Sequence, residues 1–296
     1  MERVRGPVAV RDGGRPGQAA AGVPRGGFAD GPSARLANRL VGNRDDAPLL
    51  EVALAAPRVR LTGACAIAWT GAAMACRLDG VPLPTWRRVR VPAGGATLEG
   101  GGAERGVFGY LAVGGTWEVD RWRGSASPLR VGASMLPASG VVAAGRVIAV
   151  ATELPVGGAY AHPLAGLAGG EVARPRLDVW EAPESAAWWR ALGRTFGGVD
   201  GVRAARWRVL PASDRVGVRL AGGGVGGAGS FAGMRSAPCL PGTVQLAPGG
   251  TLLVSGEDGP TMGGYPRIGR LDGGDVARLA RRRPGEAVGL AWRGWR

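Results

Sequence analysis

The sequence predicts a mainly β protein with two β-rich lobes, and three observations lead to this fold class. Glycine and proline supply 55 and 22 of the 296 residues, and such a density of turn formers favours many short strands. Hydrophobic residues make up 45% of the chain, which is enough to bury a core. Short apolar runs between turn residues occur on both sides of a Gly/Ala/Pro-rich stretch. We therefore expect a barrel or barrel-like sandwich in each lobe.

The boundary between the lobes is predicted from composition. Residues 154–170 are rich in glycine, alanine and proline, which is typical of a connector. The pattern of strands and helices begins again after it. The sequence thus predicts lobes at 1–153 and 171–296.

In the first lobe the clearest element is a short helix. Asp30 is a candidate N-cap, Pro32 suits the first turn, and Gly42-Asn43 would end the helix. The triplet Leu78-Asp79-Gly80 is typical of a hairpin turn. Strand-like apolar runs are found at residues 59–61, 64–70, 107–113 and 141–151.

The second lobe is predicted to hold two further short helices, about three in the whole chain. One covers residues 184–192, and the other is capped by Asp275 and ended by Pro284. Strands are expected at residues 176–179, 207–210, 216–220, 243–246, 252–255 and 287–292.

The type of basic residue in this chain excludes several kinds of functional site. All 37 are arginine, since the chain has no lysine. It therefore has no lysine to carry pyridoxal phosphate or biotin, and it cannot complete a lysine-dependent phosphate loop. Its single histidine, His162, excludes zinc sites that need two or three histidines, and no metal site is expected.

The net charge of +14 admits more than one kind of partner. The arginines are scattered, with one dense run at 281–283, and no aromatic pattern typical of RNA binding accompanies them. We expect no nucleic acid; an anionic small substrate and an acidic partner subunit suit the charge equally well.

The cellular compartment is predicted from cysteine usage and hydropathy. Cys65, Cys76 and Cys239 form neither an even disulfide set nor a C-x-x-C motif. No signal-like segment and no apolar stretch of about 18 residues is visible. These features favour a reduced, cytoplasmic protein without a membrane span.

Two motifs have structural interpretations that compete with functional ones. Gly224–Gly229 match G-x-G-x-x-G, but no helix is predicted after them, so a flexible loop is the better interpretation than a dinucleotide site. His162 could be a general base. It precedes Pro163 in the glycine-rich connector, and a solvated loop histidine is the preferred interpretation.

Residues 258–267 form the most chemically dense segment. Asp258, Thr261, Gly263-Gly264, Tyr265 and Arg267 follow an apolar strand. Glycines let backbone amides approach a ligand, and threonine and arginine bind carboxylate or phosphate. On residue chemistry alone, a ligand loop and a tight β-turn remain equally open.

This segment resembles the T-x-G-G-Y-P-K signature of the biotin-dependent carboxyltransferase A/B family. Further blocks agree in the family's order, so the resemblance covers a single family unit over residues 1–296. They are Asp12 to Gly17 (Q-D-x-G-R-x-G), Gly22 to Asp30 (G-V-P…D), Arg35 to Asn43 (R-L-A-N-x-L-V-G-N), the acid Glu51, Leu78 to Trp86 (L-D-G…W), Tyr110 to Val113 (Y-L-A-V), Ser213 to Leu220 (S-D-R-M-G-x-R-L) and Gly242 to Gln245 (G-x-I-Q).

The chain departs from the family pattern at several site positions. Arg267 replaces the lysine of the last signature, Arg11 a glutamine, and Gly26 a serine. The middle G-S-R-S-T block has Ala126 in place of arginine, and Ala237 replaces the acid of an S-E-G block. Loss of one positioned charge can cost orders of magnitude in rate.

The resemblance implies a cyclophilin-like β-barrel architecture and a role as the C-type component of an ATP-dependent 5-oxoprolinase, which opens 5-oxoproline to glutamate together with A-type and B-type partner proteins. ATP would be used by the complex. A non-enzymatic, KipA-like regulatory component and a urea carboxylase-type carboxyltransferase component are the alternatives. The candidate catalytic residues are Asp258, Arg215 and Arg267. The candidate substrate- or anion-binding residues are Arg15, Gln245, Thr261, Gly263, Gly264, Tyr265 and Arg267.

Overall fold

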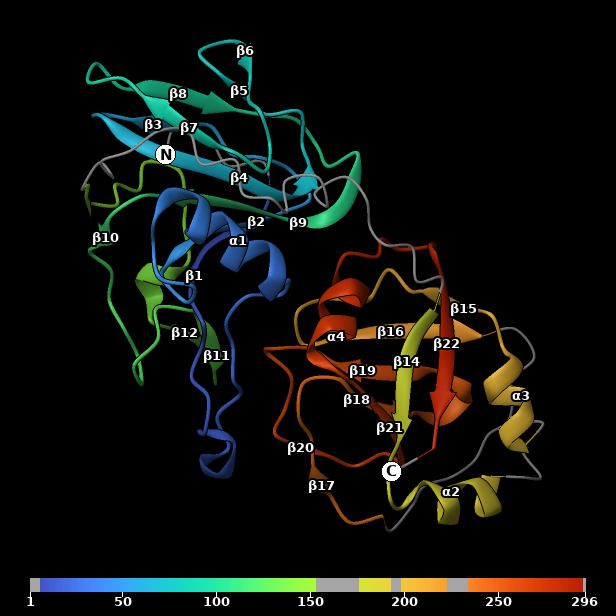
Figure 1. The fold of residues 1–296 in the computed structure, drawn as a ribbon. Coiled ribbons are helices and arrows are strands. Elements are labelled where there is room, and N and C mark those ends of the chain that lie inside the picture. Colours follow the sequence, from blue (N-terminus) through green and yellow to red (C-terminus); the bar gives the residue numbers. More distant parts are fainter. Residues whose placement is uncertain (1–5, 153–175, 193–197, 223–233, 295–296) are drawn as a thin grey trace. The chain divides into compact units, whose positions relative to one another are not determined.

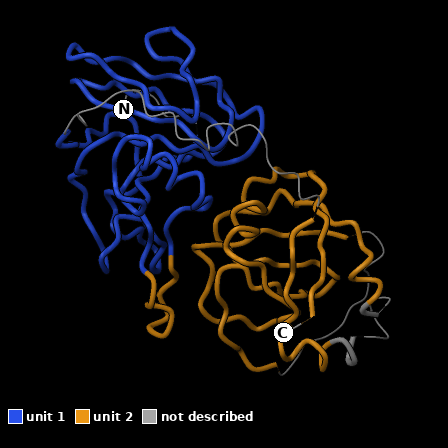
Figure 2. Tube along the Cα trace, viewed as in Figure 1, with its two compact units in different colours: residues 1–15, 26–172 blue, residues 16–25, 173–296 orange. Residues whose placement is uncertain are grey.

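The computed structural model describes residues 6–152, 176–192, 198–222 and 234–294 (Figure 1). They fall into two compact units (Figure 2). Unit 1 comprises residues 1–15 and 26–172, and unit 2 comprises residues 16–25 and 173–296. Both consist mainly of strands, which confirms the predicted fold class. The predicted connector 154–170, with His162, and Gly224–Gly229 lie outside the described residues.

Unit 1 is built from two antiparallel sheets. The larger has the order β1-β2-β9-β4-β7 and the smaller β3-β8-β5-β6. Asp79 and Gly80 both have positive φ between β5 and β6, which confirms the predicted hairpin. The bounds are β1 Val8–Arg11, β2 Leu49–Ala53, β3 Val59–Leu61, β4 Cys65–Ala73, β5 Arg77–Leu78, β6 Val81–Pro82, β7 Arg88–Val91, β8 Ala96–Glu99 and β9 Arg105–Val113.

The large sheet is covered on both faces (Figure 1). Because side chains alternate along a strand, Leu111 and Val113 of β9 face the small sheet and share a core with it. Tyr110 and Ala112 face the other way, toward helix α1 (Gly31–Val41). This sandwich accounts for the long apolar runs of β4 and β9, which are buried on both faces.

Helix α1 has the predicted ends. The Asp30 side chain accepts from the Ser33 backbone N–H at 3.2 Å, and Gly42 ends the helix in the left-handed region with φ 85°. Asn38 Nδ2 donates to the carbonyl of Ala47 at 2.9 Å, and Asn43 Nδ2 donates to that of Val113 at 2.9 Å. These asparagines hold the turn after the helix.

The predicted strand at 141–151 is wrong for most of its length. Only β13 (Val150–Ala151) is a strand there. The run begins after the 3₁₀ turn η2 (Ala138–Gly140) and is interrupted by Gly145, whose φ is 81°. The Arg146 backbone N–H donates to the Ala143 carbonyl at 3.2 Å, so the chain turns here instead of pairing as a strand. The remaining elements of unit 1 are the short pairs β10 (Thr116–Trp117) with β13, and β11 (Leu129–Val131) with β12 (Ser134–Leu136).

Unit 2 contains a closed barrel with the order β14-β21-β18-β19-β16-β15-β22. Parallel pairing of β14 with β22, such as Leu177 opposite Leu290, closes it. Val244 and Leu246 of β18 point into the barrel core, so Gln245 between them points outward. The bounds are β14 Arg176–Glu181, β15 Trp207–Val209, β16 Gly217–Gly222, β18 Thr243–Leu246, β19 Leu252–Ser255, β21 Arg267–Leu271 and β22 Ala287–Arg293.

Three helices belong to unit 2: α2 (Ser185–Leu192), α3 (Gly198–Ala204) and α4 (Gly273–Ala280). Helix α3 was not predicted, so the structure has four α-helices among its described residues rather than three. The predicted cap of α4 is also wrong: Asp272 is the N-cap and accepts from the Asp275 backbone N–H at 2.8 Å. The Asp275 side chain instead accepts from the Asp178 backbone N–H at 2.7 Å.

Outside the barrel, β17 (Ala237–Pro238) and β20 (Met262–Gly263) form a two-stranded ribbon (Figure 1). A 3₁₀ turn, η4 (Pro248–Gly250), joins β18 to β19, and another, η1 (Ala19–Ala21), lies in the segment 16–25. Within the described ranges, no helix is long and apolar enough to cross a membrane.

Candidate functional site

The ribbon brings together two of the sequence blocks that carry the resemblance. Ala237 lies opposite Gly263, and the Cys239 backbone N–H donates to the Thr261 carbonyl at 2.8 Å. Ala237 is the position where the resemblance expects an acid. The missing carboxylate would therefore have stood directly across the ribbon from the signature glycines.

Gly263 lies against Gln245. A β-carbon on Gly263 would come within 2.3 Å of Gln245 Oε1 and 3.3 Å of Cys239 Sγ. Gln245 is 5% exposed, and no donor in the described part of the chain reaches its Oε1. Cys239 Sγ lies 3.3 Å from Ser255 Oγ. A side chain at position 263 would therefore force the Gln245 amide to shift, and the ribbon covers a small polar layer on the outer face of the barrel.

Arg267 contacts both the ribbon and the residue that precedes helix α2. It is the first residue of β21 and lies opposite Gln245 in the sheet. Its Nη1 donates to the Pro238 carbonyl at 2.7 Å, and its Nη2 forms an ion pair with Glu184. The sequence indicated Arg267 but gave Glu184 no role beyond the start of a helix. The anion-binding role of Arg267 stays a prediction.

Arg215 and Asp258 contact each other. Nε and Nη2 of Arg215 donate to the two carboxylate oxygens of Asp258 at 2.8 and 3.0 Å, and both side chains are mostly buried. The neighbouring Asp214 accepts from the backbone N–H of Val216 at 2.8 Å. The S-D-R block thus forms a turn whose arginine is bound in a bidentate pair. For either partner to act on a substrate, this pair must open or include the substrate.

The other predicted residues of the signature lie beside the ribbon with different accessibility. Thr261 is half-buried, while Gly264 and Tyr265 are exposed. A β-carbon on Gly264 would meet only Ser236 Oγ, at 4.0 Å. Unit 2 therefore presents an open edge, at residues 261–265, next to the buried layer of Gln245.

Unit 1 contains a second buried polar cluster, built around Asp12. Its carboxylate accepts from the Ala126 backbone N–H at 2.7 Å and from the hydroxyls of Ser125 and Ser127. Arg121 pairs with it at 3.2 Å. Two sequence blocks more than 100 residues apart in the chain thus meet at Asp12.

Arg15 belongs to the same cluster and is 2% exposed. Its Nη2 donates to the Ser127 carbonyl at 2.6 Å, its Nε to the Trp122 carbonyl at 3.1 Å, and its guanidinium lies 5.1 Å from the Trp122 ring centre. A β-carbon on Gly26 would lie 2.9 Å from Arg15 Nη1. Arg15, predicted to bind substrate, therefore holds the loop 122–127, and Gly26 in place of serine leaves its guanidinium room.

A third buried network joins the acid and tyrosine blocks. Tyr110 Oη donates to Glu51 Oε2 at 3.0 Å and accepts from the Asp30 backbone N–H at 2.7 Å. Glu51 also accepts from the Ala29 backbone N–H at 2.9 Å and lies 3.9 Å from Arg11. These contacts fix the start of α1 on the sheet. The sequence matched Glu51 and Tyr110 separately and gave no signal that they touch.

Metal-ligating side chains are not gathered anywhere in the described ranges: no group of three or more His, Cys, Asp or Glu residues is placed to hold an ion. The three cysteines are free and buried. Burial raises the pKa of the Cys65 thiol to about 11 and that of Cys76 to about 12. Both are therefore neutral, unreactive thiols at pH 7.

Two known proteins are similar in sequence to this chain. The chain is 32% identical to the C-type component of 5-oxoprolinase from Escherichia coli (strain K12) over 282 residues, which covers 92% of this chain and 83% of that protein. It is 39% identical to urea amidolyase of Saccharomyces cerevisiae over 119 residues, 40% of this chain and 6% of that protein.

Solved structures share the fold. The crystal structure of TTHA0988 matches with a TM-score of 0.77 and 31% identity over 98% of this chain. This chain spans 58% of the TTHA0988 chain. The Kluyveromyces lactis urea amidolyase matches with a TM-score of 0.80 and 23% identity, over 18% of its length, and shows the fold alone.

The family match covers nearly the whole chain. The family described as carboxyltransferase domain, subdomain A and B, matches residues 21–292, across both units. The chain therefore belongs to this carboxyltransferase family.

Proposed function

We propose that this chain is the C-type component of an ATP-dependent 5-oxoprolinase, which opens the lactam of 5-oxoproline to give glutamate. The observation that carries this proposal is the length of the match: the C-type component of the E. coli 5-oxoprolinase aligns over most of both chains. The urea amidolyase match covers 40% of this chain and 6% of that protein. Because the alignment with the 5-oxoprolinase component covers 92% of this chain, it includes sequence blocks from both units.

In this proposal the open edge at residues 261–265 binds the substrate. 5-Oxoproline is an anion, and its carboxylate would pair with Arg267, aided by the Thr261 hydroxyl. The guanidinium already binds one carboxylate, that of Glu184. Exchanging one charge-assisted pair for another removes the need to bury an uncompensated charge. Arg267 keeps the positive charge of the family's lysine but cannot shuttle a proton, because an arginine pKa lies far above neutrality.

ATP is assigned to the complex rather than to this chain. Of the described basic residues in the unit 2 site, Arg215 is paired with Asp258, and Arg267 with Glu184. The chain has no lysine to complete a phosphate loop. Either arginine would have to leave its carboxylate partner to hold a triphosphate. Partner proteins of the A and B type would supply this part of the reaction.

A second candidate is a KipA-like regulatory component without catalysis of its own. Two observations favour it: Ala237 stands where the family pattern has an acid, opposite Gly263, and the Arg215–Asp258 pair is closed. A carboxyltransferase component of a urea carboxylase-type system is the third candidate, supported by the family description.

Reconstitution tests the three candidates. The chain is mixed with A-type and B-type proteins from its own organism, and glutamate formation from 5-oxoproline is followed with and without ATP. We expect ATP-dependent turnover by the full set and none by the chain alone, because no complete set of acid, base and nucleophile is assembled in the described residues. Robust turnover by the chain alone, lost in Asp258→Asn or Arg215→Ala, would overturn this.

Controls separate the candidates. Asp200→Asn removes an exposed carboxylate of α3 and should leave turnover unchanged. A complex that forms but stays inactive, while altering the activity of a partner, supports the regulatory component. Transfer of carboxylate from a carboxylated biotin carrier to urea supports the third candidate.

A further inference from the structure

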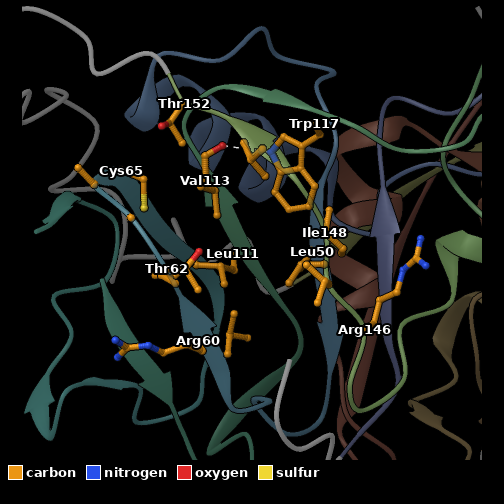
Figure 3. Close-up of a pocket in the computed structure, with 16 residues that line it drawn as sticks. Leu50, Arg60, Thr62, Cys65, Leu111, Val113, Trp117, Arg146, Ile148 and Thr152 are labelled. Atoms are coloured by element: carbon orange, nitrogen blue, oxygen red, sulfur yellow. Dashed lines mark hydrogen bonds between the residues drawn. The ribbon is translucent and has the colours of Figure 1, made fainter. Parts of the chain in front are cut away.

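Unit 1 contains a pocket that none of the candidate site residues lines. Its volume is about 330 Å³ (Figure 3). Leu50, Cys65, Leu111 and Val113 form one wall, on the face of the large sheet that packs against the small sheet. Trp117 and Ile148 contribute from the segments around β10 and β13.

The pocket is too large to be a packing defect. Protein cores hold few voids larger than a water molecule. An engineered cavity of about 150 Å³ with apolar walls already binds benzene. The space in unit 1 is about twice that, and it falls at the lower end of the range for ligand pockets.

Apolar side chains form most of the inner wall, and the indole N–H among them has a partner. Trp117 Nε1 donates to the Val113 carbonyl at 3.1 Å, drawn in Figure 3, so the indole needs no ligand acceptor. Leu111, Leu50 and Cys65 are at most 4% exposed and lie behind the pocket surface, whereas Ile148 and Val150 are half-buried and present apolar surface to it. A ligand in contact with these side chains gains from leaving water but finds no hydrogen-bond partner among them.

No charge is directed inward. The pKa of the Cys65 thiol, raised by burial to about 11, keeps it neutral. Arg60 lines the pocket with its stem, but its guanidinium donates to Gly94 O at 3.0 Å and Thr97 Oγ1 at 3.2 Å. Arg146 is exposed, and its guanidinium points away from Leu50 in Figure 3. An ionised ligand would lose its hydration without a counter-charge.

Hydroxyl groups lie at the open side. Thr62 and Thr152 both line the pocket and are both exposed. A hydroxyl both donates and accepts. The pocket is therefore apolar inside, with two hydrogen-bonding groups at its mouth.

We propose that this pocket binds a small, uncharged, largely apolar molecule, of the size of a substituted benzene ring, with one hydroxyl or carbonyl group held at the mouth by Thr62 or Thr152. This site is separate from the proposed oxoprolinase site, whose candidate residues do not line it. The inference stands whether or not that function is correct.

The test compares two probes of matched shape, 4-bromobenzyl alcohol and 4-bromobenzoate. Binding to the whole chain is measured by calorimetry and by quenching of tryptophan fluorescence, since bromine quenches an indole that it touches. We expect the alcohol to bind at one site with a Kd below about 1 mM, and the benzoate to bind at least about tenfold more weakly. Equal or tighter binding of the benzoate would overturn the neutral-ligand proposal.

Variants locate the site. Ile148→Trp fills the pocket and should weaken the alcohol's binding at least about tenfold. Val131→Trp places the same side chain at an exposed position of β11 outside the pocket and should change nothing. Trp117→Phe should remove most of the quenching and retain the calorimetric signal. Unchanged affinity in a folded Ile148→Trp, unchanged quenching in Trp117→Phe, or no saturable binding by the parent would each refute the proposal.

Discussion

Gly263 and Gln245 are in such close contact that a single added methyl group would collide with the glutamine oxygen. The Cβ of an alanine at 263 would lie 2.3 Å from Gln245 Oε1. Gln245 is held by β18 beside the barrel core, and Gly263 by its pairing with Ala237. A side chain at position 263 would therefore have to displace the buried Gln245 amide for the ribbon to stay on the barrel.

Gly263→Ala is expected to destabilise unit 2 by about 1–3 kcal/mol, the usual range for overpacking. Urea denaturation measures it, with Gly264→Ala as the matched control, because a β-carbon there meets only Ser236 Oγ at 4.0 Å. Gln245→Ala should recover part of the loss in the double variant, since it removes the oxygen that is struck. Equal stability of the two alanine variants would contradict this packing account.

Asp30→Ala is expected to cost about 1–2 kcal/mol in unfolding free energy. The side chain caps α1 through the Ser33 N–H and accepts from Ser33 Oγ at 2.6 Å, and it is completely buried. Thermal denaturation checks the loss, with Asp272→Ala, the cap of α4, as the comparison in the other unit. If Asp30→Ala keeps its melting temperature while the complex loses activity, Asp30 serves the reaction rather than the helix.

Arg267 can be tested in the assembled complex. If it binds an anion, Arg267→Lys should retain most activity and Arg267→Ala should lose about tenfold or more, which corresponds to one lost charge-assisted contact. A lysine variant much faster than the parent would indicate proton transfer instead. An alanine variant as active as the parent would remove Arg267 from the site and leave it the structural contacts with Pro238 and Glu184.

The stability of unit 1 should fall at alkaline pH because of its buried thiols. The pKa of Cys76 is about 12 in the folded protein against an ordinary 9.0, so the unfolded chain loses its proton first. The contribution is complete below pH 9 and is lost as pH rises from about 9 toward 12. Cys76→Ala should flatten the fall of unfolding free energy by up to about 1.4 kcal/mol per pH unit in this window. Equal slopes for parent and variant would contradict it.

The sequence by itself determined the local elements whose signals are local. Asp30, Pro32 and Gly42 define α1 because capping and φ preferences act within a few residues. Asp79-Gly80 defines a hairpin for the same reason. Six of the seven barrel strands were predicted within a few residues, since apolar runs between turn formers are typical of β structure; β21 was not predicted. The family also followed from the order of the blocks.

Local sequence signals could not place an element where two residues or two structures satisfied the same signal equally well. Asp272 and Asp275 both suit an N-cap, and the choice depends on Asp178, 97 residues away, whose N–H engages the Asp275 carboxylate. The apolar run at 141–151 satisfied the composition of a strand, but strand pairing is a long-range property. The turn at Gly145 leaves only Val150–Ala151 paired with β10.

Only the tertiary structure decided which candidate side chains contact one another. It directs Arg15 and Asp12 onto the loop 122–127, Arg215 onto Asp258, and Arg267 onto Glu184, contacts that span up to 115 residues. Charge and hydrogen-bonding capacity are properties of a residue type and can be read from the sequence. Which partner satisfies them depends on how strands far apart in the chain pair, and that is set by packing of the whole core.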